Sequence, residues 1–479
     1  MTIRFTLCYH RLMKLSAFKA YDVRGRIPDE INETLAKDIG RAYARLVQPR
    51  RVVVGRDIRL TSQNLAKALI EGLSESGASV TDIGLCGTEE VYFATSSGDD
   101  LGVFEGGIMV TASHNPPDYN GMKFVREGSR PISADSGLRD MAAMISEGQL
   151  SLRSSTGRHP TVGTVRPYNA KPVYLRHLLS YVDVARLRRL KVVVNAGNGG
   201  AGAVVDLIEP HLPFEFIKVH HEADGSFPNG VPNPMLEQNR RSTVEAIRRS
   251  GADVGLAWDG DFDRCFFFDE SGRFIEGYYL VGLLAQSFLE REPGARIVHD
   301  PRLTWNTLDI VKRGGGVPVL CKSGHAFIKQ KMREVDAAYG GEMSAHHYFR
   351  NFAYCDSGMI PWLLVLERIC RSGKSLSQLV DERIVMFPCS GEINLSLPDG
   401  RVARQMLQER FIGEAKSIDV TDGLSMEFSE WRVNLRSSNT EPLVRLNVES
   451  RGSLSLMQSR TAEIIDLLQR FGAQPADTH

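Results

Sequence analysis

The chain has 479 residues, which is too long for a single hydrophobic core and suggests three or four domains. Lys plus Arg equals Asp plus Glu, at 58 each, so the overall charge argues against nucleic acid or an acidic membrane surface as a partner. The seven cysteines are scattered without CxxC spacing, which argues against a disulfide framework and a cysteine zinc site and favours a reducing, cytoplasmic compartment. No apolar stretch reaches the ~18 residues of a membrane helix.

The regular pattern begins after an N-terminal extension of about fifteen residues. A short apolar run at residues 51–57 enters a polar turn, and residues 62–76 then carry apolar side chains at helical spacing. Similar runs at residues 191–200 and 296–302 also meet Gly, Asn, Asp or Pro and lead into a helix. Continuous apolar runs of this length are typical of parallel strands buried on both faces. The pattern therefore predicts three α/β domains of related design.

Three segments mark boundaries between domains. Residues 157–172 are rich in Thr, Pro and Gly and are interpreted as a linker, residues 269–272 form a turn, and the pattern changes at residues 385–390. The last hundred residues contain alternating strand patterns and a terminal amphipathic helix, which indicates an α+β domain. The expected domains are residues 1–163, 164–270, 271–385 and 386–479.

Residues 111–124 read TASHNPPDYNGMKF and follow an apolar, Gly-rich run that is typical of a strand end. The two prolines have no N–H to give to a helix, so Ser113 and His114 are expected on a stiff loop. A hydroxyl, an imidazole, an amide and a cation on such a loop can form a nucleophile with its supporting groups. An ordinary Pro/Asn turn is the alternative interpretation.

Asp259, Asp261 and Asp263 lie two residues apart between two apolar runs. In an extended chain alternate side chains point the same way, so the three carboxylates are expected to converge and to need a cation. Oxygen ligands of this kind suit Mg²⁺. An EF-hand is excluded because Arg264 stands where that loop needs glycine, and a solvated acidic turn is the alternative.

Two later loops combine groups that suit a phosphorylated sugar. Residues 341–348 hold a carboxylate, a hydroxyl and two imidazoles, which can donate to and accept from sugar hydroxyls. His346 and His347 are adjacent, so their side chains cannot both face one site. Residues 436–442 read RSSNTEP, a turn that can cradle a phosphate or simply form a polar surface. Residues 322–325 can add positive charge and a proton carrier.

Taken in this order, the loops TASHNP, DGDFDR, GEMS and RSSNTEP resemble those of the phosphohexomutase superfamily. Their amino-acid sequences are most similar to those of the bacterial phosphomannomutases. The resemblance runs from about Phe18 to about Leu468. It implies an α/β fold with four domains around a central cleft, of which three are related α/β domains with mixed sheets and the last is a C-terminal α+β domain.

The same resemblance implies an isomerase, an intramolecular phosphotransferase acting on a phosphorylated hexose. It would interconvert mannose 6-phosphate and mannose 1-phosphate through an enzyme phosphoserine and a bound hexose 1,6-bisphosphate, supplying GDP-mannose and polysaccharide synthesis. The alternatives are a dual-specificity phosphoglucomutase/phosphomannomutase, a phosphatase and a non-catalytic sugar-phosphate binding protein. A monomer or a homodimer is expected.

Roles for individual residues also follow from the resemblance. The phosphoryl group is carried by Ser113, and the further catalytic positions are Arg24, Lys123 and His114. Mg²⁺ is held by Asp259, Asp261, Asp263 and Ser113. Substrate contacts are implied for Arg264, Arg302, Gly324, His325, Glu342, Ser344 and His346. The non-reacting phosphate is bound by Arg436, Ser438, Asn439 and Thr440.

Three points stay open in the sequence. Bacterial relatives often have a lysine where this chain has Arg302, so the phosphate contact there is the weakest of these assignments. Either His346 or His347 can be the residue that touches the sugar. The group that handles the hydroxyl proton is one of Arg24, Lys123, His114 and His325.

Overall fold

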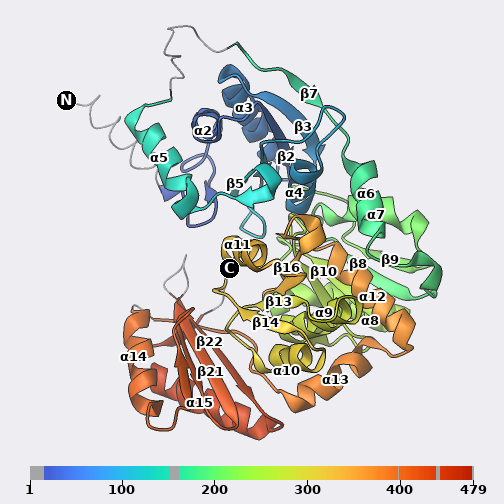
Figure 1. The fold of residues 1–479 in the computed structure, drawn as a ribbon, viewed down its shortest axis with the longest axis vertical. Helices are drawn as coiled ribbons and strands as arrows, with labels where there is room; N and C mark the ends of the chain where they lie inside the picture. The colour runs from blue at the N-terminus through green and yellow to red at the C-terminus, as the bar shows by residue number, and fades with distance from the viewer. Residues whose placement is uncertain (1–15, 151–160, 398, 438–442, 477–479) are drawn as a thin grey trace. The chain divides into compact units, whose positions relative to one another are not determined.

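The structure is a computed structural model that describes residues 16–150, 161–397, 399–437 and 443–476 (Figure 1). The predicted N-terminal extension, together with Ser438, Asn439 and Thr440, lies outside the described residues. The chain forms two compact units. The first unit comprises Met1–Ala246, Leu256–Cys265 and Cys355–Ile360, and the second comprises Ile247–Gly255, Phe266–Tyr354 and Pro361–His479.

The first sheet is mixed and has the strand order β1-β5-β4-β2-β3-β7, with β6 paired to β5. Strand β2 pairs in parallel with β3 and β4, whereas β4 and β5 are antiparallel. The strands are β1 (Val23–Arg26), β2 (Arg51–Arg56), β3 (Ser79–Leu85), β4 (Gly106–Val110), β5 (Tyr119–Arg126), β6 (Arg130–Pro131) and β7 (Val165–Pro167). The helices are α2 (Glu33–Val47), α3 (Ser62–Glu75), α4 (Thr88–Ser97) and α5 (Leu138–Glu147).

The second sheet has the order β12-β11-β10-β8-β9 and the third β14-β13-β15-β16-β17. The second contains β8 (Lys191–Asn195), β9 (Glu215–Val219), β10 (Val254–Trp258), β11 (Cys265–Phe268) and β12 (Phe274–Ile275), with helices α6 (Lys171–Leu179), α7 (Ala201–Ile208) and α8 (Arg241–Ser250). The third contains β13 (Arg296–His299), β14 (Val317–Leu320), β15 (Tyr339–Gly341), β16 (His347–Phe349) and β17 (Cys355–Asp356), with helices α9 (Gly277–Arg291), α10 (Trp305–Arg313), α11 (His325–Val335), α12 (Ile360–Ser372) and α13 (Leu376–Met386).

The three apolar runs predicted as parallel strands are β2, β8 and β13. Each of them pairs in parallel with a neighbour, β2 with β3, β8 with β9 and β13 with β14. Each also leads into a helix, which is α3, α7 or α10 respectively. In β2, Val52, Val53 and Val54 have no exposed surface, as expected for a strand covered on both faces. The prediction of three related α/β domains is confirmed.

The fourth sheet differs from the other three because, among the described residues, its strands all pair antiparallel. Its order is β19-β20-β21-β22-β18-β23. The strands are β18 (Ile393–Ser396), β19 (Ser417–Asp419), β20 (Leu424–Glu427), β21 (Trp431–Ser437), β22 (Leu443–Ser450) and β23 (Gln474–Pro475), and the helices are α14 (Gly400–Phe411) and α15 (Leu454–Gln469). The α+β character predicted for the C-terminal part is therefore confirmed (Figure 1, red).

The linker expected at residues 157–172 is only partly a connection. Residues 165–167 form β7, which pairs in parallel with β3 at the edge of the first sheet, and α6 begins at Lys171. Short strands of this kind carry little pattern of their own, because the partner strand supplies the ladder. The segment before β7, residues 151–160, lies outside the described residues.

A buried carboxylate joins the fourth sheet to the third within the second unit. Glu449 of β22 has no exposed surface and accepts hydrogen bonds from the backbone N–H of Thr304 at 2.8 Å and of Trp305 at 3.1 Å. These are the first N–H groups of α10, which have no partner inside the helix. The hydroxyl of Tyr278 donates to the same carboxylate. Helix α10 is thus capped by a residue almost 150 positions further along the chain.

Helices α2 and α3 approach each other through a pair of glycines. A Cβ placed on Gly72 of α3 would lie 2.1 Å from the carbonyl oxygen of Lys37, and one on Gly40 of α2 would lie 2.4 Å from that of Leu69. Both contacts are with backbone, which cannot rotate away. The close approach lets Leu35, Ile39 and Leu69 pack in one buried core with the sheet.

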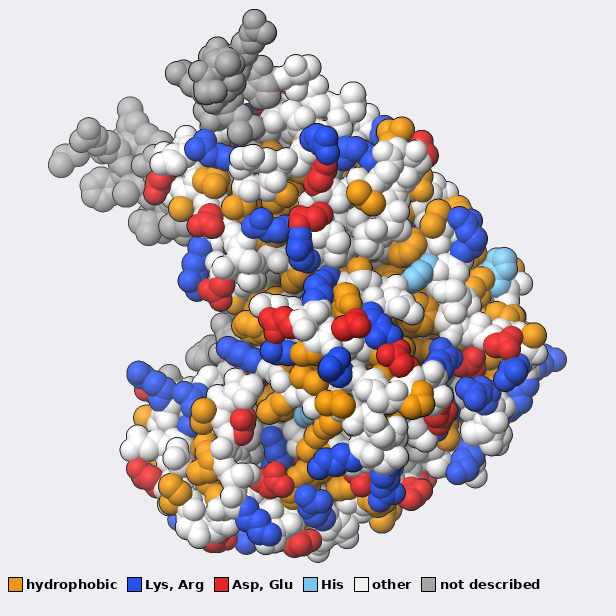
Figure 2. Space-filling view, viewed as in Figure 1, with side chains coloured by type: hydrophobic (Ala, Val, Ile, Leu, Met, Phe, Trp, Pro, Cys, Tyr) orange, Lys and Arg blue, Asp and Glu red, His pale blue; other side chains and the backbone are white. Residues whose placement is uncertain are grey.

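Among the described residues, no helix combines the length and the apolar character that crossing a bilayer requires. The face drawn in Figure 2 carries Lys and Arg side chains interspersed with Asp and Glu rather than a patch of one sign. This distribution agrees with the equal numbers of acidic and basic residues in the sequence.

The glycine pair gives a first prediction. Gly72→Ala should lower the free energy of unfolding by about 1–3 kcal/mol, because the forced separation of two helices outweighs the gain in helix propensity. Denaturant unfolding measures the change. Gly413→Ala is the matched control, since a Cβ there meets no atom within 4 Å and should change stability by less than about 0.5 kcal/mol. Equal stabilities for the two variants would contradict the packing argument.

Candidate active site

Ser113 lies on the loop between β4 and β5, as predicted, and is 4% exposed. Its φ of 51° is in the left-handed region, which non-glycine residues seldom adopt. Its N–H donates to Thr111 Oγ1 at 2.9 Å. Its hydroxyl lies 3.0 Å from His114 Nδ1 and 3.1 Å from Asp259 Oδ2. The loop therefore presents a buried hydroxyl directly to the predicted metal-binding carboxylates.

The three aspartates converge, although not in the predicted way. All are at most 2% exposed, and one oxygen from each lies within 4.8 Å of the others. The chain is not extended here. Phe262 N–H donates to Asp259 O at 3.1 Å and Phe262 has a φ of 47°, so the residues between β10 and β11 form a turn. The expectation of alternate side chains on an extended strand is wrong, because the turn itself gathers the carboxylates.

The ring of Phe262 explains why this turn is stable. It is fully buried and lies against Gly87 and Gly200, where a Cβ would come within 2.2 Å and 2.9 Å of ring atoms. Gly87 precedes α4, whose first residue Thr88 donates its hydroxyl to Asp261 Oδ2 and its N–H to Asp261 O. The start of α4 and the aspartate turn are thus shaped to each other.

Charge in the aspartate turn is only partly balanced by the chain. Lys123 of β5 places Nζ 2.7 Å from Asp261 Oδ2 and 2.6 Å from Asp263 Oδ2, and Arg264 Nε lies 2.8 Å from Asp259 Oδ2. Burial opposes the ammonium charge, but the two carboxylates raise the pKa of Lys123 above its usual range. Burial raises the pKa of Asp259 to about 7 in spite of Arg264. Three carboxylates face two cations.

The donor set of the turn fits a divalent metal ion. Asp261 Oδ1 is buried and has no hydrogen-bond partner among the described residues. The turn supplies carboxylate oxygens, the ligands that Mg²⁺ and similar hard cations prefer, and it retains an excess of negative charge. A cation bound to these oxygens would also favour the ionised form of Asp259.

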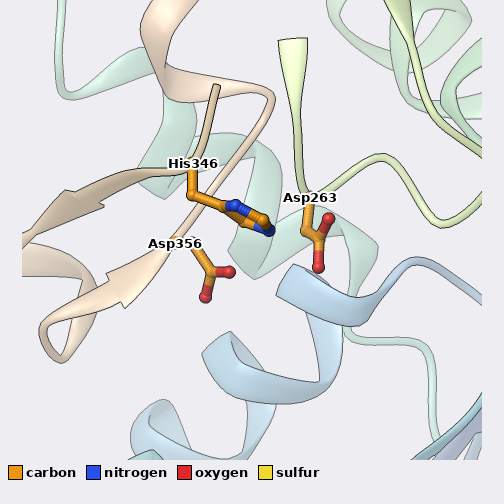
Figure 3. A group of neighbouring side chains, drawn as sticks. All are labelled: Asp263, His346 and Asp356. Carbon is orange, nitrogen blue, oxygen red and sulfur yellow. The ribbon is translucent and has the colours of Figure 1, made fainter. Parts of the chain in front are cut away.

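A further carboxylate lies beside the turn. Asp356 of β17 is 1% exposed, and one of its oxygens lies within 4.8 Å of one of Asp263; both residues belong to the first unit (Figure 3). His346, also drawn there, belongs to the second unit. Asp356 stands in no recognisable motif and is 93 positions from Asp263, so the sequence pattern offered no signal for it.

Two predicted catalytic residues flank the serine loop. Arg24 of β1 donates from Nη1 to Asn115 Oδ1 and from Nη2 to Asp22 Oδ2, both at 2.6 Å. His114 receives an N–H of Arg264 at the same Nδ1 that faces Ser113. Burial and then Arg264 lower the pKa of His114 well below its usual value, so its imidazole is neutral near pH 7. Because a guanidinium can only donate, Nδ1 acts as a hydrogen-bond acceptor between Arg264 and the Ser113 hydroxyl.

The second unit brings together the residues predicted to contact the sugar. Glu342 is 3% exposed, and its carboxylate accepts from Gly324 N at 2.9 Å and from the Tyr348 hydroxyl at 2.5 Å. Ser344 Oγ lies 3.3 Å from Arg302 Nη2 and 3.4 Å from His346 Nδ1. His325 is the first residue of α11, directly after Gly324.

The two adjacent histidines have different surroundings. His347 is fully buried in β16, with its Nδ1 2.7 Å from the Tyr339 hydroxyl, and burial lowers its pKa to about 3. His346 retains about a fifth of its side-chain surface. His347 is thus a core residue, and His346 is the more exposed member of the pair.

Arg302 is more deeply enclosed than a typical substrate contact. It is 2% exposed and donates from Nε and Nη2 to Asp300 at 3.1 and 2.8 Å. Its guanidinium also lies 3.5 Å from Glu342 and 3.3 Å from Glu392. It therefore links the loop of Glu342 to the loop that contains Glu392.

Glu392 is the centre of an arginine cluster. Its carboxylate lies 3.3 Å from Arg302, 3.2 Å from Arg436 and 3.3 Å from Arg445. Arg436 and Arg445 are directly opposite on β21 and β22, a placement that repels unless an anion lies between them. Although burial opposes ionisation, Arg436 and then the other arginines lower the pKa of Glu392 to about 2. Because Arg302 is also paired with Asp300 and Glu342, the arginines that share Glu392 most directly are Arg436 and Arg445, and Arg436 lies on the strand that enters the predicted phosphate loop.

Four sheets in this order, with a serine beside buried carboxylates in the first unit and clustered arginines in the second, define a multidomain α/β enzyme of phosphoryl transfer. Models of all four domains of the phosphoglucomutase/phosphomannomutase family match the chain. The alpha/beta/alpha domains I, II and III match residues 15–147, 172–272 and 276–387, and the C-terminal domain matches residues 392–467. The chain belongs to the phosphoglucomutase/phosphomannomutase family.

Individual relatives agree with this assignment. A protein of Xanthomonas campestris described as phosphohexose mutases is 59% identical over 460 residues, which are 95% of this chain and 100% of the relative. A phosphomannomutase of Salmonella montevideo is 57% identical over 459 residues, 95% of this chain and 99% of the relative. A crystal structure of a family member from Burkholderia thailandensis is 31% identical, with a TM-score of 0.86, and covers 96% of this chain and 99% of that chain. The resemblance found in the four loops is confirmed.

Glu392 gives a prediction for pH. Its pKa falls from 4.5 in the unfolded chain to about 2 in the folded one, so its charge stabilises the fold above pH 4.5 by about 3 kcal/mol, and this is lost as the pH falls through 2. Glu392→Gln should therefore lower the free energy of unfolding by about 3 kcal/mol at pH 7 and by almost nothing near pH 2. Denaturant unfolding across this range measures the difference.

The control for this measurement is the exposed Glu409 of α14, whose change to Gln should alter stability little at any pH. A Glu392→Gln deficit that stays constant between pH 7 and pH 2 would show that the arginine cluster does not depend on the charge of Glu392.

Proposed function

We propose that the chain is a phosphomannomutase, which interconverts mannose 6-phosphate and mannose 1-phosphate through a phosphoserine at Ser113 and a bound hexose 1,6-bisphosphate. The observation that carries the proposal is the Ser113 hydroxyl, 3.1 Å from a carboxylate of the buried aspartate turn. The chain is also 57% identical, along nearly its whole length, to a phosphomannomutase. The product would supply GDP-mannose for polysaccharide synthesis.

The reaction consists of two transfers in opposite directions. In the first, the bond between phosphorus and Ser113 Oγ breaks and a bond to the free sugar hydroxyl oxygen forms; that hydroxyl gives up a proton, and Ser113 Oγ takes one up. In the second, the other phosphate of the bisphosphate returns to Ser113, whose hydroxyl gives up its proton while the released sugar oxygen takes one up. His114, with Nδ1 3.0 Å from Ser113 Oγ, is proposed to accept that proton, since the negative charge of the arriving phosphoryl group offsets the low pKa of its ring. Lys123, whose Nζ contacts Asp261 and Asp263, is proposed to contribute positive charge to the same site.

Mg²⁺ is proposed as the cation of the aspartate turn, held by Asp259, Asp261 and Asp263 with an oxygen on Ser113. When bound, it supplies positive charge to the seryl phosphate, which is the main requirement of phosphoryl transfer. Arg264 and Lys123 hold the three carboxylates in place.

The second unit supplies the proposed contacts to the sugar and to its non-reacting phosphate. The carboxylate of Glu342 and the hydroxyl of Ser344 can each bond to hydroxyls of a sugar presented in either orientation. His346 is the proposed third contact. Arg436 is proposed to bind the non-reacting phosphate with Ser438, Asn439 and Thr440, and the position of Arg445 directly opposite it on β22 supports this role.

The proposed domains divide near residues 163, 270 and 385, and the four family matches support this division. The first boundary is better placed after Pro167, because β7 completes the first sheet. A cytoplasmic location is proposed as well. None of the six cysteines that the structure describes forms a disulfide bond, which suits a reducing compartment.

A coupled assay tests the proposed reaction. Wild-type protein with a catalytic amount of hexose 1,6-bisphosphate should convert mannose 1-phosphate faster than glucose 1-phosphate, and Ser113→Ala should lose more than about 10³-fold of this turnover. The intact mass of the wild-type chain should include a phosphoryl group that maps to Ser113. Ser146→Ala, on α5, is the matched control and should retain turnover.

Several results would count against the proposal. Retained turnover in Ser113→Ala would exclude the serine as carrier. Release of free phosphate in place of isomerised sugar phosphate would indicate a phosphatase, and a preference for glucose 1-phosphate would transfer the assignment to a phosphoglucomutase.

Metal binding gives an independent test that needs no turnover. Addition of Mg²⁺ at about 100 times its Kd should raise the free energy of unfolding by about 2.7 kcal/mol, and EDTA should reverse the effect. Asp261→Asn should remove most of this stabilisation, whereas Asp140→Asn on the exposed face of α5 should retain it. A stabilisation that is equal in both variants would place the ion elsewhere.

A further inference from the structure

The serine loop is built around a buried guanidinium. Arg59 is 3% exposed and follows β2 by three residues. Its Nη1 donates to Pro116 O at 2.7 Å and to Tyr119 O at 2.9 Å. Its Nη2 donates to Ser113 O at 3.0 Å and to Asn115 O at 2.5 Å. Four backbone carbonyls within the seven residues 113–119 thus accept hydrogen bonds from one side chain.

Arg59 is itself held in place from two sides. Asp57, which is 4% exposed, accepts the backbone N–H of Arg59 at 3.0 Å and lies 3.5 Å from its Nε, and the Ser62 hydroxyl donates to the same carboxylate. On the opposite side the ring of Phe227 packs against the guanidinium, with 5.2 Å from Cζ to the ring centroid. The guanidinium has little room to move.

These contacts bear directly on the backbone of the reacting residue. Ser113 has a φ of 51°, which L residues rarely adopt without support from their surroundings. The bond from Arg59 to the Ser113 carbonyl fixes the peptide that follows, while Thr111 Oγ1 fixes the N–H that precedes it. In this conformation the side chain reaches Asp259 Oδ2. A residue that gives and takes back one phosphoryl group depends on such a fixed position.

We propose that Arg59 is a positioning residue for Ser113, a role that rests on the proposed function. All four hydrogen bonds from its terminal nitrogens go to backbone carbonyls of the serine loop, so the guanidinium binds the loop and not the substrate. The planar fork, rather than the positive charge, is what the loop requires. A lysine keeps the charge but offers a single ammonium that cannot reach four carbonyls in this geometry.

The test is Arg59→Lys in the full chain, assayed with mannose 1-phosphate and hexose 1,6-bisphosphate. We expect kcat to fall about a hundred-fold, because a displaced nucleophile loses the reactive geometry. KM should stay within about three-fold, because Arg59 makes none of the proposed sugar contacts. Hydrogen exchange of the Asn115 and Tyr119 amides, which bond within the loop, should be faster than in wild type.

Arg333→Lys is a matched control for the loss of packing. Arg333 also donates to two backbone carbonyls, Lys329 O at 3.0 Å and Ala353 O at 2.5 Å, and lies 5.3 Å from the centroid of the Tyr354 ring. Its replacement should cost comparable stability and leave kcat within about two-fold of wild type. If Arg59→Lys fails to fold, Phe227→Leu removes only the ring beside the guanidinium and should lower kcat in the same direction by a smaller factor.

The outcomes separate this proposal from the function on which it rests. If wild type turns over and Arg59→Lys retains kcat within about two-fold, the positioning role is overturned. The same conclusion follows if kcat falls equally in Arg333→Lys, or if only KM changes. If wild type shows no mutase activity, the proposed function fails, and unchanged exchange of the loop amides in Arg59→Lys would still refute the positioning role.

Discussion

Three like charges in one buried turn are the constraint on which the rest of the first unit depends. Asp259, Asp261 and Asp263 can share so small a space only with cations among them. Lys123 from β5 and Arg264 from the turn itself supply part of that charge. Separation of β5 from the turn would leave the buried charges of Lys123, Asp261 and Asp263 without partners. These ion pairs therefore hold the aspartate turn against β5, the strand that follows Ser113. The serine is kept where negative charge brought by a phosphoryl group would be neutralised.

Much of this arrangement could be predicted from sequence because its signals are local. The strands β2, β8 and β13 are continuous apolar runs ended by turn residues, and the three aspartates of the aspartate turn lie within five consecutive residues. The conformation of that turn could not be predicted, because Phe262 adopts a positive φ only through the space left by Gly87 and Gly200. Those glycines are distant in sequence, so no local pattern records their effect.

Other parts of the site depend on partners too far apart for any spacing rule. Asp356 lies close to Asp263, although 93 positions separate them in the sequence. Strand β7 forms because it can pair with the edge strand β3. Arg302 illustrates the same limit, since resemblance placed it as a substrate contact. In the structure its guanidinium meets Asp300, Glu342 and Glu392 at once. A lysine at this position would lack the fork that makes three such contacts, so the guanidinium has a structural role as well as its charge.

The cap that Glu449 places on α10 bears on how freely the parts of this chain can be cut and recombined. Family boundaries suggest a C-terminal module that could be removed or exchanged as a unit. Yet the carboxylate that completes α10 is carried by β22, and it also receives the Tyr278 hydroxyl from α9. A chain shortened before β22 would lose more than strands of the fourth sheet. It would leave the N–H groups of Thr304 and Trp305 and the hydroxyl of Tyr278 without their partner inside the preceding α/β domain. The third and fourth sheets should therefore be kept together in any shortened or recombined chain.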